Sequence, residues 1–185
     1  MERLVASSTT LLVVDVQEKL AAAMPPSMVD EVVKNAGILL ETADALGMRV
    51  LASEQYPKGL GPTVAGVATK LAAMSVTPMP KMAFDACSEL TLSRALADSG
   101  AKSVVVVGME AHVCVFQTAL DLLVSGMGVW IVADAVSSRT PQNKAIALQR
   151  LTAEGVKLSS TEMALFEMLA VSGTNEFREI SKIIK

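Results

Sequence analysis

The chain has 185 residues, of which 51% are hydrophobic and 3% are aromatic, and its formal net charge is −3 at pH 7. This length predicts one domain spanning residues 1–185. The negative charge, the scarcity of aromatic residues and the lack of a basic run argue against nucleic acid as the main partner. The apolar runs are far shorter than the roughly 20 residues of a membrane-spanning helix, so we expect no membrane partner.

In the first half of the chain, apolar residues alternate between strand and helix periodicity. The first strand ends in Asp15, and Gln17 follows two residues later. Between the second strand and the second helix lies a loop at 53–63, rich in glycine, proline and charge, which is a typical place for binding residues. The expected elements are a strand at 9–15, a helix at 28–46, a strand at 48–52, a helix at 64–74 and an edge strand at 75–80.

In the second half, four consecutive valines, Val104–Val107, predict a strand that is buried on both faces. Strands and helices alternate throughout, which predicts a three-layer, doubly wound α/β fold with a mainly parallel sheet and helices on both faces. The expected elements are a helix at 88–98, a strand at 103–107, a helix at 113–125, a strand at 129–134, a helix at 141–154, a strand at 156–159, and helices at 161–170 and 175–185.

Cys114 lies where the valine-rich strand passes into a helix. Ligands of open α/β sheets bind at this end of the strands. A helix N-terminus stabilises negative charge, so we expect the pKa of the Cys114 thiol to be lowered. The alternative is that Cys114 is a small buried core residue.

Asp15, Lys81 and Cys114 each follow a predicted strand, so all three side chains could meet at one edge of the sheet. Asp15 could instead cap a helix, and Lys81 could be a solvated loop residue. Together they are chemically consistent, because a carboxylate can take the proton of a thiol and an ammonium favours the resulting charges. The sequence has no G-x-G-x-x-G, Walker or G-x-S-x-G motif, which argues against a nucleotide site and a serine nucleophile elbow.

The cysteine and histidine content also restricts the chemistry. Cys87 and Cys114 form no CxxC motif, which favours a reducing, cytoplasmic setting. His112 is the single histidine, so a cluster of histidine ligands is excluded, and we expect no metal and no cofactor. Asp134 and Arg139, which follow the strand at 129–134, are expected to hold loop structure.

Several of these motifs, taken together, resemble the isochorismatase-like cysteine hydrolases. The resemblance covers about Thr9 to Leu169 and is closest to compact isochorismatase domain-containing members of the family. It is carried by Leu-Val-Val-Asp-Val-Gln at 12–17, Lys81 ahead of Phe84, Gly-Met-Glu-Ala-His-Val-Cys-Val at 108–115 and Val-Ala-Asp-Ala-Val-Ser-Ser-Arg at 132–139.

The resemblance implies a Rossmann-like, six-stranded sheet, a homo-oligomer (dimer or tetramer) and a catalytic triad of Asp15, Lys81 and Cys114. It also implies a cis peptide bond between Met109 and Glu110, with the amides of Glu110 and Cys114 facing an oxyanion. The implied reaction is hydrolysis of an amide or carbamoyl-type C–N bond in a small-molecule substrate, through a thioester on the cysteine. Candidate substrate-binding residues are Gln17, Tyr56, Phe84 and His112.

The loop at 53–61 departs from the metal-binding nicotinamidases of this family, because it has neither histidine nor aspartate. Nicotinamide is therefore a less favoured substrate. His112 could contact substrate or pack at a subunit contact. Three other functions stay open: hydrolysis of a vinyl ether, as in the true isochorismatases, an oligomeric binding or scaffold protein with little turnover, and a redox role for Cys114.

Overall fold

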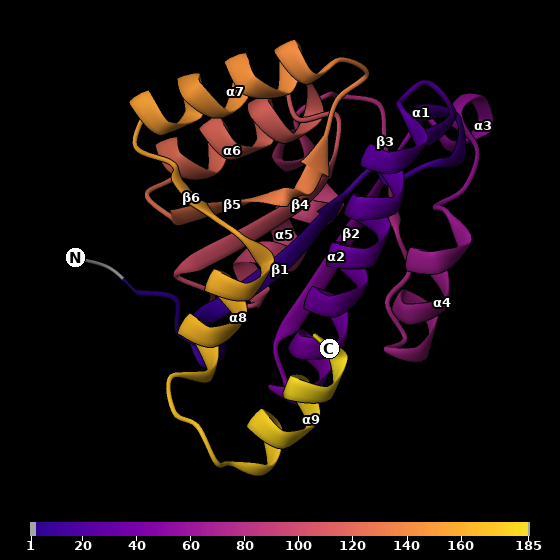
Figure 1. Ribbon diagram of the computed structural model, residues 1–185. Coiled ribbons are helices and arrows are strands. Elements are labelled where there is room, and N and C mark those ends of the chain that lie inside the picture. The colour runs from indigo at the N-terminus through magenta and orange to yellow at the C-terminus, as the bar shows by residue number, and fades with distance from the viewer. Residues whose placement is uncertain (1–2, 185) are drawn as a thin grey trace.

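A computed structural model describes residues 3–184, and within them six strands form one sheet whose neighbouring strands are all parallel (Figure 1). This architecture confirms the predicted doubly wound α/β fold. The strands are β1 (Thr9–Val14), β2 (Arg49–Gln55), β3 (Met79–Lys81), β4 (Ser103–Met109), β5 (Gly128–Ser137) and β6 (Lys157–Ser159).

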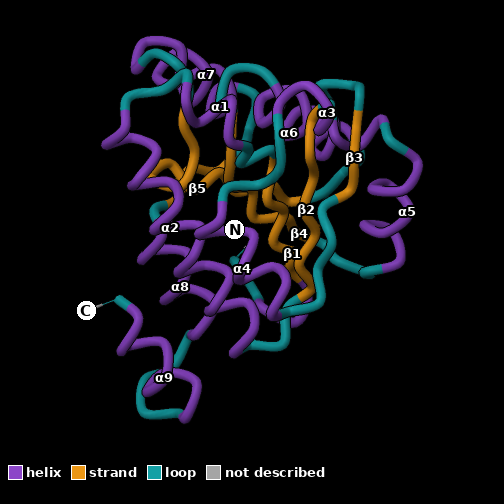
Figure 2. Tube along the Cα trace, turned by 90° about the vertical axis from the view of Figure 1, so that its right-hand side faces the viewer, coloured by secondary structure: helices purple, strands orange, loops and turns teal. Residues whose placement is uncertain are grey.

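The helices connect these strands and cover both faces of the sheet (Figure 2). Two short 3-10 turns, Ala6–Ser8 and Ala86–Ser88, accompany them. The α-helices are α1 (Glu18–Ala22), α2 (Pro26–Ala45), α3 (Pro57–Leu60), α4 (Ala65–Ala73), α5 (Leu90–Asp98), α6 (Cys114–Val124), α7 (Pro141–Ala153), α8 (Thr161–Leu169) and α9 (Asn175–Ile183).

Successive side chains of a strand point to opposite faces of a sheet, and β1 shows this clearly. Leu11 and Val13 belong to a core formed with α2, α4 and α8. Leu12 and Val14 belong to a second core formed with α5, α6 and α7. Residues Val104–Val107 of β4 are fully buried, as the run of valines predicts.

The strand order is β3-β2-β1-β4-β5-β6, so the chain moves outward in one direction from β1 and then in the other direction from β4. Such a reversal leaves a crevice beyond the carboxyl ends of the two central strands, which is where open α/β sheets bind ligands. The functional residues predicted from the sequence lie around this crevice.

Gly108 allows β4 to approach β1 closely at this end of the sheet. Its φ angle is +126°, and a Cβ atom at this position would lie 1.9 Å from the carbonyl oxygen of Val14. A side chain is therefore excluded, and the pairing of β4 with β5 shifts its register between Val106 and Gly108. The turn that leads to Cys114 begins directly after this irregularity.

Some element boundaries differ from the sequence-based expectation. The edge strand was expected at 75–80, but β3 spans Met79–Lys81. It begins later because Ser75 adopts a positive φ and Pro78 cannot donate a ladder hydrogen bond. The loop expected at 53–63 contains the end of β2 and all of α3. The last helix ends at Ile183, and Lys185 lies outside the described residues. None of the helices in residues 3–184 is long and apolar enough to cross a membrane.

Candidate active site

Asp15 and Cys114 lie on the two central strands' carboxyl side, at the crevice between β1 and β4. Asp15 directly follows β1 with a φ of +50°, and its amide donates to the carbonyl of Ser53 at 3.1 Å. Cys114 is the first residue of α6, which follows β4. Lys81 ends β3, two strands away from β1, so its long side chain has to reach across the end of β2.

Asp15 and Lys81 form a buried ion pair. Their Oδ2 and Nζ atoms are 2.7 Å apart, and the two side chains are 0% and 1% exposed. The other carboxylate oxygen, Oδ1, accepts a hydrogen bond from the Ser53 hydroxyl at 2.8 Å. Among the described residues, Oδ2 pairs with Lys81 and accepts no hydrogen bond from another residue's amide or hydroxyl.

The Lys81 ammonium is held from several directions. It donates to the side-chain oxygen of Gln55 at 2.6 Å and to the carbonyls of Ala83 and Phe84 at 3.1 and 3.0 Å. These contacts fix the loop that follows β3 around the ammonium. Glu89 holds the same loop from outside, by accepting hydrogen bonds from the amides of residues 82 and 83.

The Cys114 thiol lies within hydrogen-bonding reach of both Asp15 and Lys81. Burial and the Asp15 carboxylate raise its pKa to about 12, although Lys81 acts in the opposite direction. The expectation of a lowered pKa is therefore wrong. The helix N-terminus does not compensate for the loss of hydration at a residue that is 4% exposed, so the resting group is a thiol.

Two backbone amides near the thiol are free to bind an anion. Within residues 3–184, the amides of Glu110 and Cys114 donate no hydrogen bond, whereas those of Val113 and Val115 both donate to the Glu110 carbonyl, at 3.0 and 3.2 Å. The peptide bond between Met109 and Glu110 is cis. The two free amides are the donors that the resemblance assigns to an oxyanion.

The Glu110 side chain binds Arg139 through both carboxylate oxygens. Oε1 accepts from the Arg139 Nε at 2.9 Å and from its amide at 3.2 Å, and Oε2 accepts from Nη2 at 2.6 Å. Burial raises the pKa of Glu110, but these bonds outweigh it and the pKa is lowered. Asp134 accepts instead from Thr161 at the start of α8, so the two residues expected to hold loop structure do so with different partners.

A cavity of about 340 Å³ opens above the thiol. Of the four predicted substrate-binding residues, only Phe84 lines it. The other lining residues come from the short helices α1 and α3, from the end of β2, from the turn before α6, from the first residue of α6 and from the segment after β5. The cavity is lined by Leu20, Gln55, Leu60, Phe84, Glu110, Val113, Cys114 and Arg139.

The other three predicted substrate-binding residues lie around the cavity without lining it. Gln17 is fully buried, and its side-chain amide binds the backbone of Gln55 and Gly61. It therefore holds the end of β2 and the segment after α3 in place. Tyr56 is about half exposed and lies over Gly59, where a Cβ atom would collide with its ring. His112 contacts Ser138 at 3.0 Å through Nδ1.

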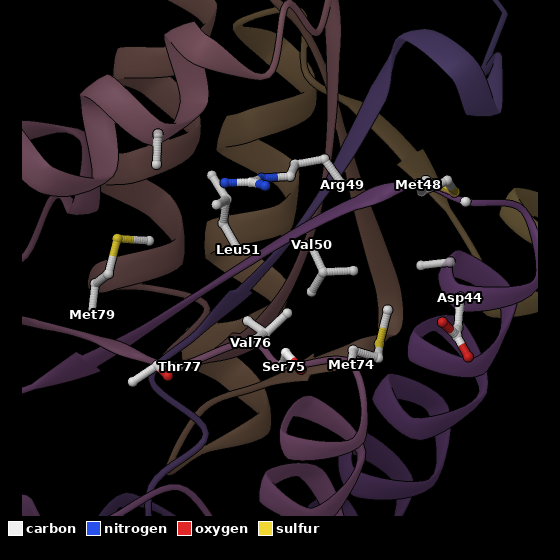
Figure 3. A pocket seen from close by; sticks show the side chains of 13 residues that line it. Asp44, Met48, Arg49, Val50, Leu51, Met74, Ser75, Val76, Thr77 and Met79 are labelled. Carbon is white, nitrogen blue, oxygen red and sulfur yellow. The ribbon is translucent and has the colours of Figure 1, made fainter.

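A separate cavity of about 430 Å³ lies at the amino end of β2, opposite the carboxyl edge where Asp15 and Cys114 meet (Figure 3). Its lining includes Asp44, Arg49 and Met74, and none of the residues predicted for the active site. A third feature is a group of Asp85, Cys87 and Asp121, whose side-chain oxygen and sulfur atoms lie within 4.8 Å of one another.

The chain also resembles known proteins over almost its whole length. It is 38% identical to isochorismatase domain-containing protein 2 of Danio rerio over 98% of this chain and 89% of the relative. A solved structure described as MAR1 ribonuclease from Caenorhabditis elegans has a TM-score of 0.92 and 33% identity, covering 99% of this chain and 92% of that one. The YcaC gene product of Escherichia coli, described as an octameric hydrolase of unknown specificity, has a TM-score of 0.89 and 20% identity, with 98% and 89% covered.

A family model, the isochorismatase domain, matches residues 9–163, which include all of β1 to β6 and the three residues Asp15, Lys81 and Cys114. With the strand order and the relatives above, this match confirms the family that the sequence motifs indicate. The chain belongs to the isochorismatase family, whose members are generally hydrolases.

Proposed function

We propose that this protein is a cysteine-dependent hydrolase that cleaves the C–N bond of a small amide or carbamoyl compound through a thioester on Cys114. One observation carries the proposal: Cys114 lines a cavity, and its thiol lies within reach of the buried Asp15–Lys81 ion pair. A base, a counter-charge and a nucleophile are thus brought together at the strand ends, as nucleophilic catalysis requires.

The first half of the reaction forms the thioester. Asp15 takes the thiol proton as the sulfur of Cys114 attacks the carbonyl carbon, and the carbonyl oxygen becomes an oxyanion. The free amides of Glu110 and Cys114 stabilise this oxyanion. Asp15 then gives its proton to the nitrogen of the substrate, the C–N bond breaks, and ammonia or an amine leaves.

The second half releases the acid. Asp15, again a carboxylate, takes a proton from a water molecule as the water oxygen attacks the thioester carbon. The C–S bond breaks, the sulfur receives the proton held by Asp15, and the carboxylic acid departs. Lys81 remains an ammonium throughout and balances whichever of its two neighbours carries negative charge.

The raised pKa of Cys114 fits this order of events. A free thiolate is scarce near neutral pH in the resting protein, so the proton has to leave as the new C–S bond forms. Asp15 is the group within hydrogen-bonding reach that can accept it. We therefore expect the thiol to attack while its proton is transferred. The position of Cys114 at a helix N-terminus, taken alone, would instead suggest a preformed thiolate.

Ammonia release from a panel of primary amides, repeated with added hydroxylamine, tests the proposal. A thioester transfers its acyl group to hydroxylamine, so a hydroxamate should appear, and Cys114→Ala should lose both products by about 10³-fold or more. Cys87→Ser serves as the matched control and should retain activity. Full amide hydrolysis by Cys114→Ala would refute the thioester. Cleavage of a vinyl ether without hydroxamate would favour the isochorismatase reaction instead.

A further inference from the structure

We infer that the substrate carries no charge and that its acyl group is compact and apolar. This inference rests on the proposed amide hydrolysis and narrows it to one class of amide. It comes from the walls of the cavity above Cys114 and from the state of each charged or polar group that faces this cavity.

Apolar side chains from four separate segments form the walls. Leu20 lies in α1, Leu60 in α3, Phe84 in the loop after β3 and Val113 in the turn before α6. The enclosed volume of about 340 Å³ is at the small end of the range for ligand sites. Four independent segments that each present an apolar side chain to the same space favour an apolar ligand group there.

Lys81 has no hydrogen bond left for a substrate anion. Its ammonium group faces the Asp15 carboxylate, the Gln55 side-chain oxygen and the carbonyls of residues 83 and 84. These oxygens already exceed the three N–H bonds of an ammonium. The charge of Lys81 is also balanced by Asp15, so a carboxylate in the cavity would gain little from it.

The side-chain amide of Gln55 is partly engaged in hydrogen bonds within the protein. Its side-chain oxygen accepts from Lys81 at 2.6 Å, and its Nε2 donates to the Met82 carbonyl at 2.9 Å. These two bonds turn its amide toward the loop after β3. Gln55 therefore contributes a surface to the cavity while its oxygen and one of its N–H groups are already bonded.

The pair of Glu110 and Arg139 is the remaining charged feature of the wall. Glu110 takes the Nε, Nη2 and backbone amide of Arg139, and its carboxylate is almost fully buried. The Arg139 side chain is 56% exposed, so solvent screens its attraction for any further charge. The pair has no net charge and therefore offers no strong attraction to a charged ligand.

A charged acyl group would thus lose its hydration on entering this cavity and meet only charges that already have a counter-charge, whereas an apolar group of the same shape would gain from burial. A matched pair of amides separates these cases. In 4-methylpentanamide an isopropyl group occupies the place of the carboxylate of succinamate. Butanamide and β-alaninamide form a second pair, in which a methyl group stands for an ammonium.

We expect kcat/KM for 4-methylpentanamide to exceed that for succinamate by about tenfold or more, and the same order for butanamide over β-alaninamide. Leu60→Gln should reduce the preference for 4-methylpentanamide. Val124→Gln is a matched control, because Val124 is 86% exposed on α6 and does not line the cavity.

Protection of Cys114 against a slow alkylating agent gives a second reading that needs no turnover. Protection by 4-methylpentanamide without ammonia release would support the substrate class while refuting the proposed hydrolysis. Equal or better use of succinamate, or of β-alaninamide, would overturn the substrate class and leave amide hydrolysis standing. Neither hydrolysis nor protection with any of the four amides would overturn both.

Discussion

The two cysteines of this protein differ in exposure, because Cys114 is buried and Cys87 is partly exposed, and they also differ in the charges around them. Desolvation is the main cause that raises the pKa of both thiols to about 12. Around Cys114, the Asp15 carboxylate raises the pKa and the Lys81 ammonium lowers it. Around Cys87, Asp85 and Asp121 both raise it. Negative charge that forms at Cys114 has a compensating cation, whereas at Cys87 it would add to two carboxylates.

This difference in charge distinguishes the proposed catalytic site from the group around Cys87. The Asp85, Cys87 and Asp121 group also lies partly beside a cavity, of about 280 Å³, and has a perturbed thiol. A perturbed pKa alone would therefore rank the two sites equally. Two features distinguish Cys114: a counter-charge held at 2.7 Å from the carboxylate, and two amides with no hydrogen-bond acceptor in residues 3–184.

Replacing the carboxylate beside each thiol should give the largest contrast. Asp15→Asn removes the proposed base and should lower kcat by about 10²–10⁴-fold. Asp85→Asn keeps the oxygen that accepts from the Cys87 amide and should leave kcat within about twofold of the wild type, since surface changes remote from the chemistry are usually small. Hydroxamate formation measures both, and circular dichroism checks that each variant folds. Equal losses in the two variants would erase the distinction.

Removing the counter-charge should affect stability as well as activity. Lys81→Met leaves the Asp15 carboxylate buried without its cation, and breaking a buried pair by removing one partner costs about 3–5 kcal/mol. Urea unfolding at pH 7 measures this loss. Lys58→Met on α3 is a control with no such partner role and should unfold almost as the wild type. A loss below about 1 kcal/mol would show that the pair contributes little.

The sequence was sufficient for the fold and for the proximity of Asp15, Lys81 and Cys114, because these depend on strong local signals. The run Val104–Val107 predicts a strand buried on both faces, and the helix expected at 141–154 is α7, which Thr140 caps by accepting from the Asn143 amide. Asp15 and Cys114 each follow a predicted strand. Parallel strands place their carboxyl ends on one side, so these residues meet without any information on long-range contacts.

The walls of the cavity could not be predicted in the same way. Leu20 and Leu60 lie in helices of five and four residues, which are too short to show a helical period. Gln55 was expected in a loop, because the predicted second strand ends three residues early. The pKa of Cys114 depends on burial and on the charges of Asp15 and Lys81, which are distant in the sequence, so no local pattern contains it. Arg139 pairs with Glu110, 29 residues away.

Alkylation rates should sharpen the comparison further, because they report the thiolate fraction of each cysteine. Asp15 is proposed to assist catalysis, yet it should slow alkylation of Cys114. Each carboxylate raises the pKa of its neighbouring thiol, so Asp15→Asn should speed labelling of Cys114 and Asp85→Asn that of Cys87. A decrease of one pKa unit increases the thiolate about tenfold at pH 8. Iodoacetamide labelling followed by peptide mass spectrometry resolves the two sites.

Lys81→Met should slow labelling of Cys114 only, because the ammonium lowers the pKa of that thiol and is absent from the surroundings that shift Cys87. The Asp15→Asn variant should therefore hydrolyse amides more slowly than the wild type while its Cys114 is alkylated faster. Slower alkylation of Cys114 in Asp15→Asn would instead mean that the carboxylate activates the resting thiol, contrary to its raised pKa.

The smallest expected effect concerns Glu110, whose ionised form is stabilised by Arg139. Burial raises the pKa of Glu110, the Arg139 bonds lower it further than burial raises it, and the folded value lies below the unfolded one. The ionised form therefore stabilises the fold above the unfolded pKa of about 4.3, and this stabilisation is lost as the pH falls through the folded pKa.

Glu110→Gln should lower the free energy of unfolding by about 1 kcal/mol at pH 7 and by less at pH 3, because one charge-assisted interaction is replaced by weaker hydrogen bonds. Urea unfolding at both pH values measures the difference. Glu31→Gln, on the exposed side of α2, should leave the pH profile unchanged. If Glu110→Gln lost as much stability at pH 3 as at pH 7, the shape of the side chain and not its charge would account for the loss. Packing, and not the ion pair, would then hold Glu110 in the cavity wall. Arg139 would in that case be available to bind a charged substrate.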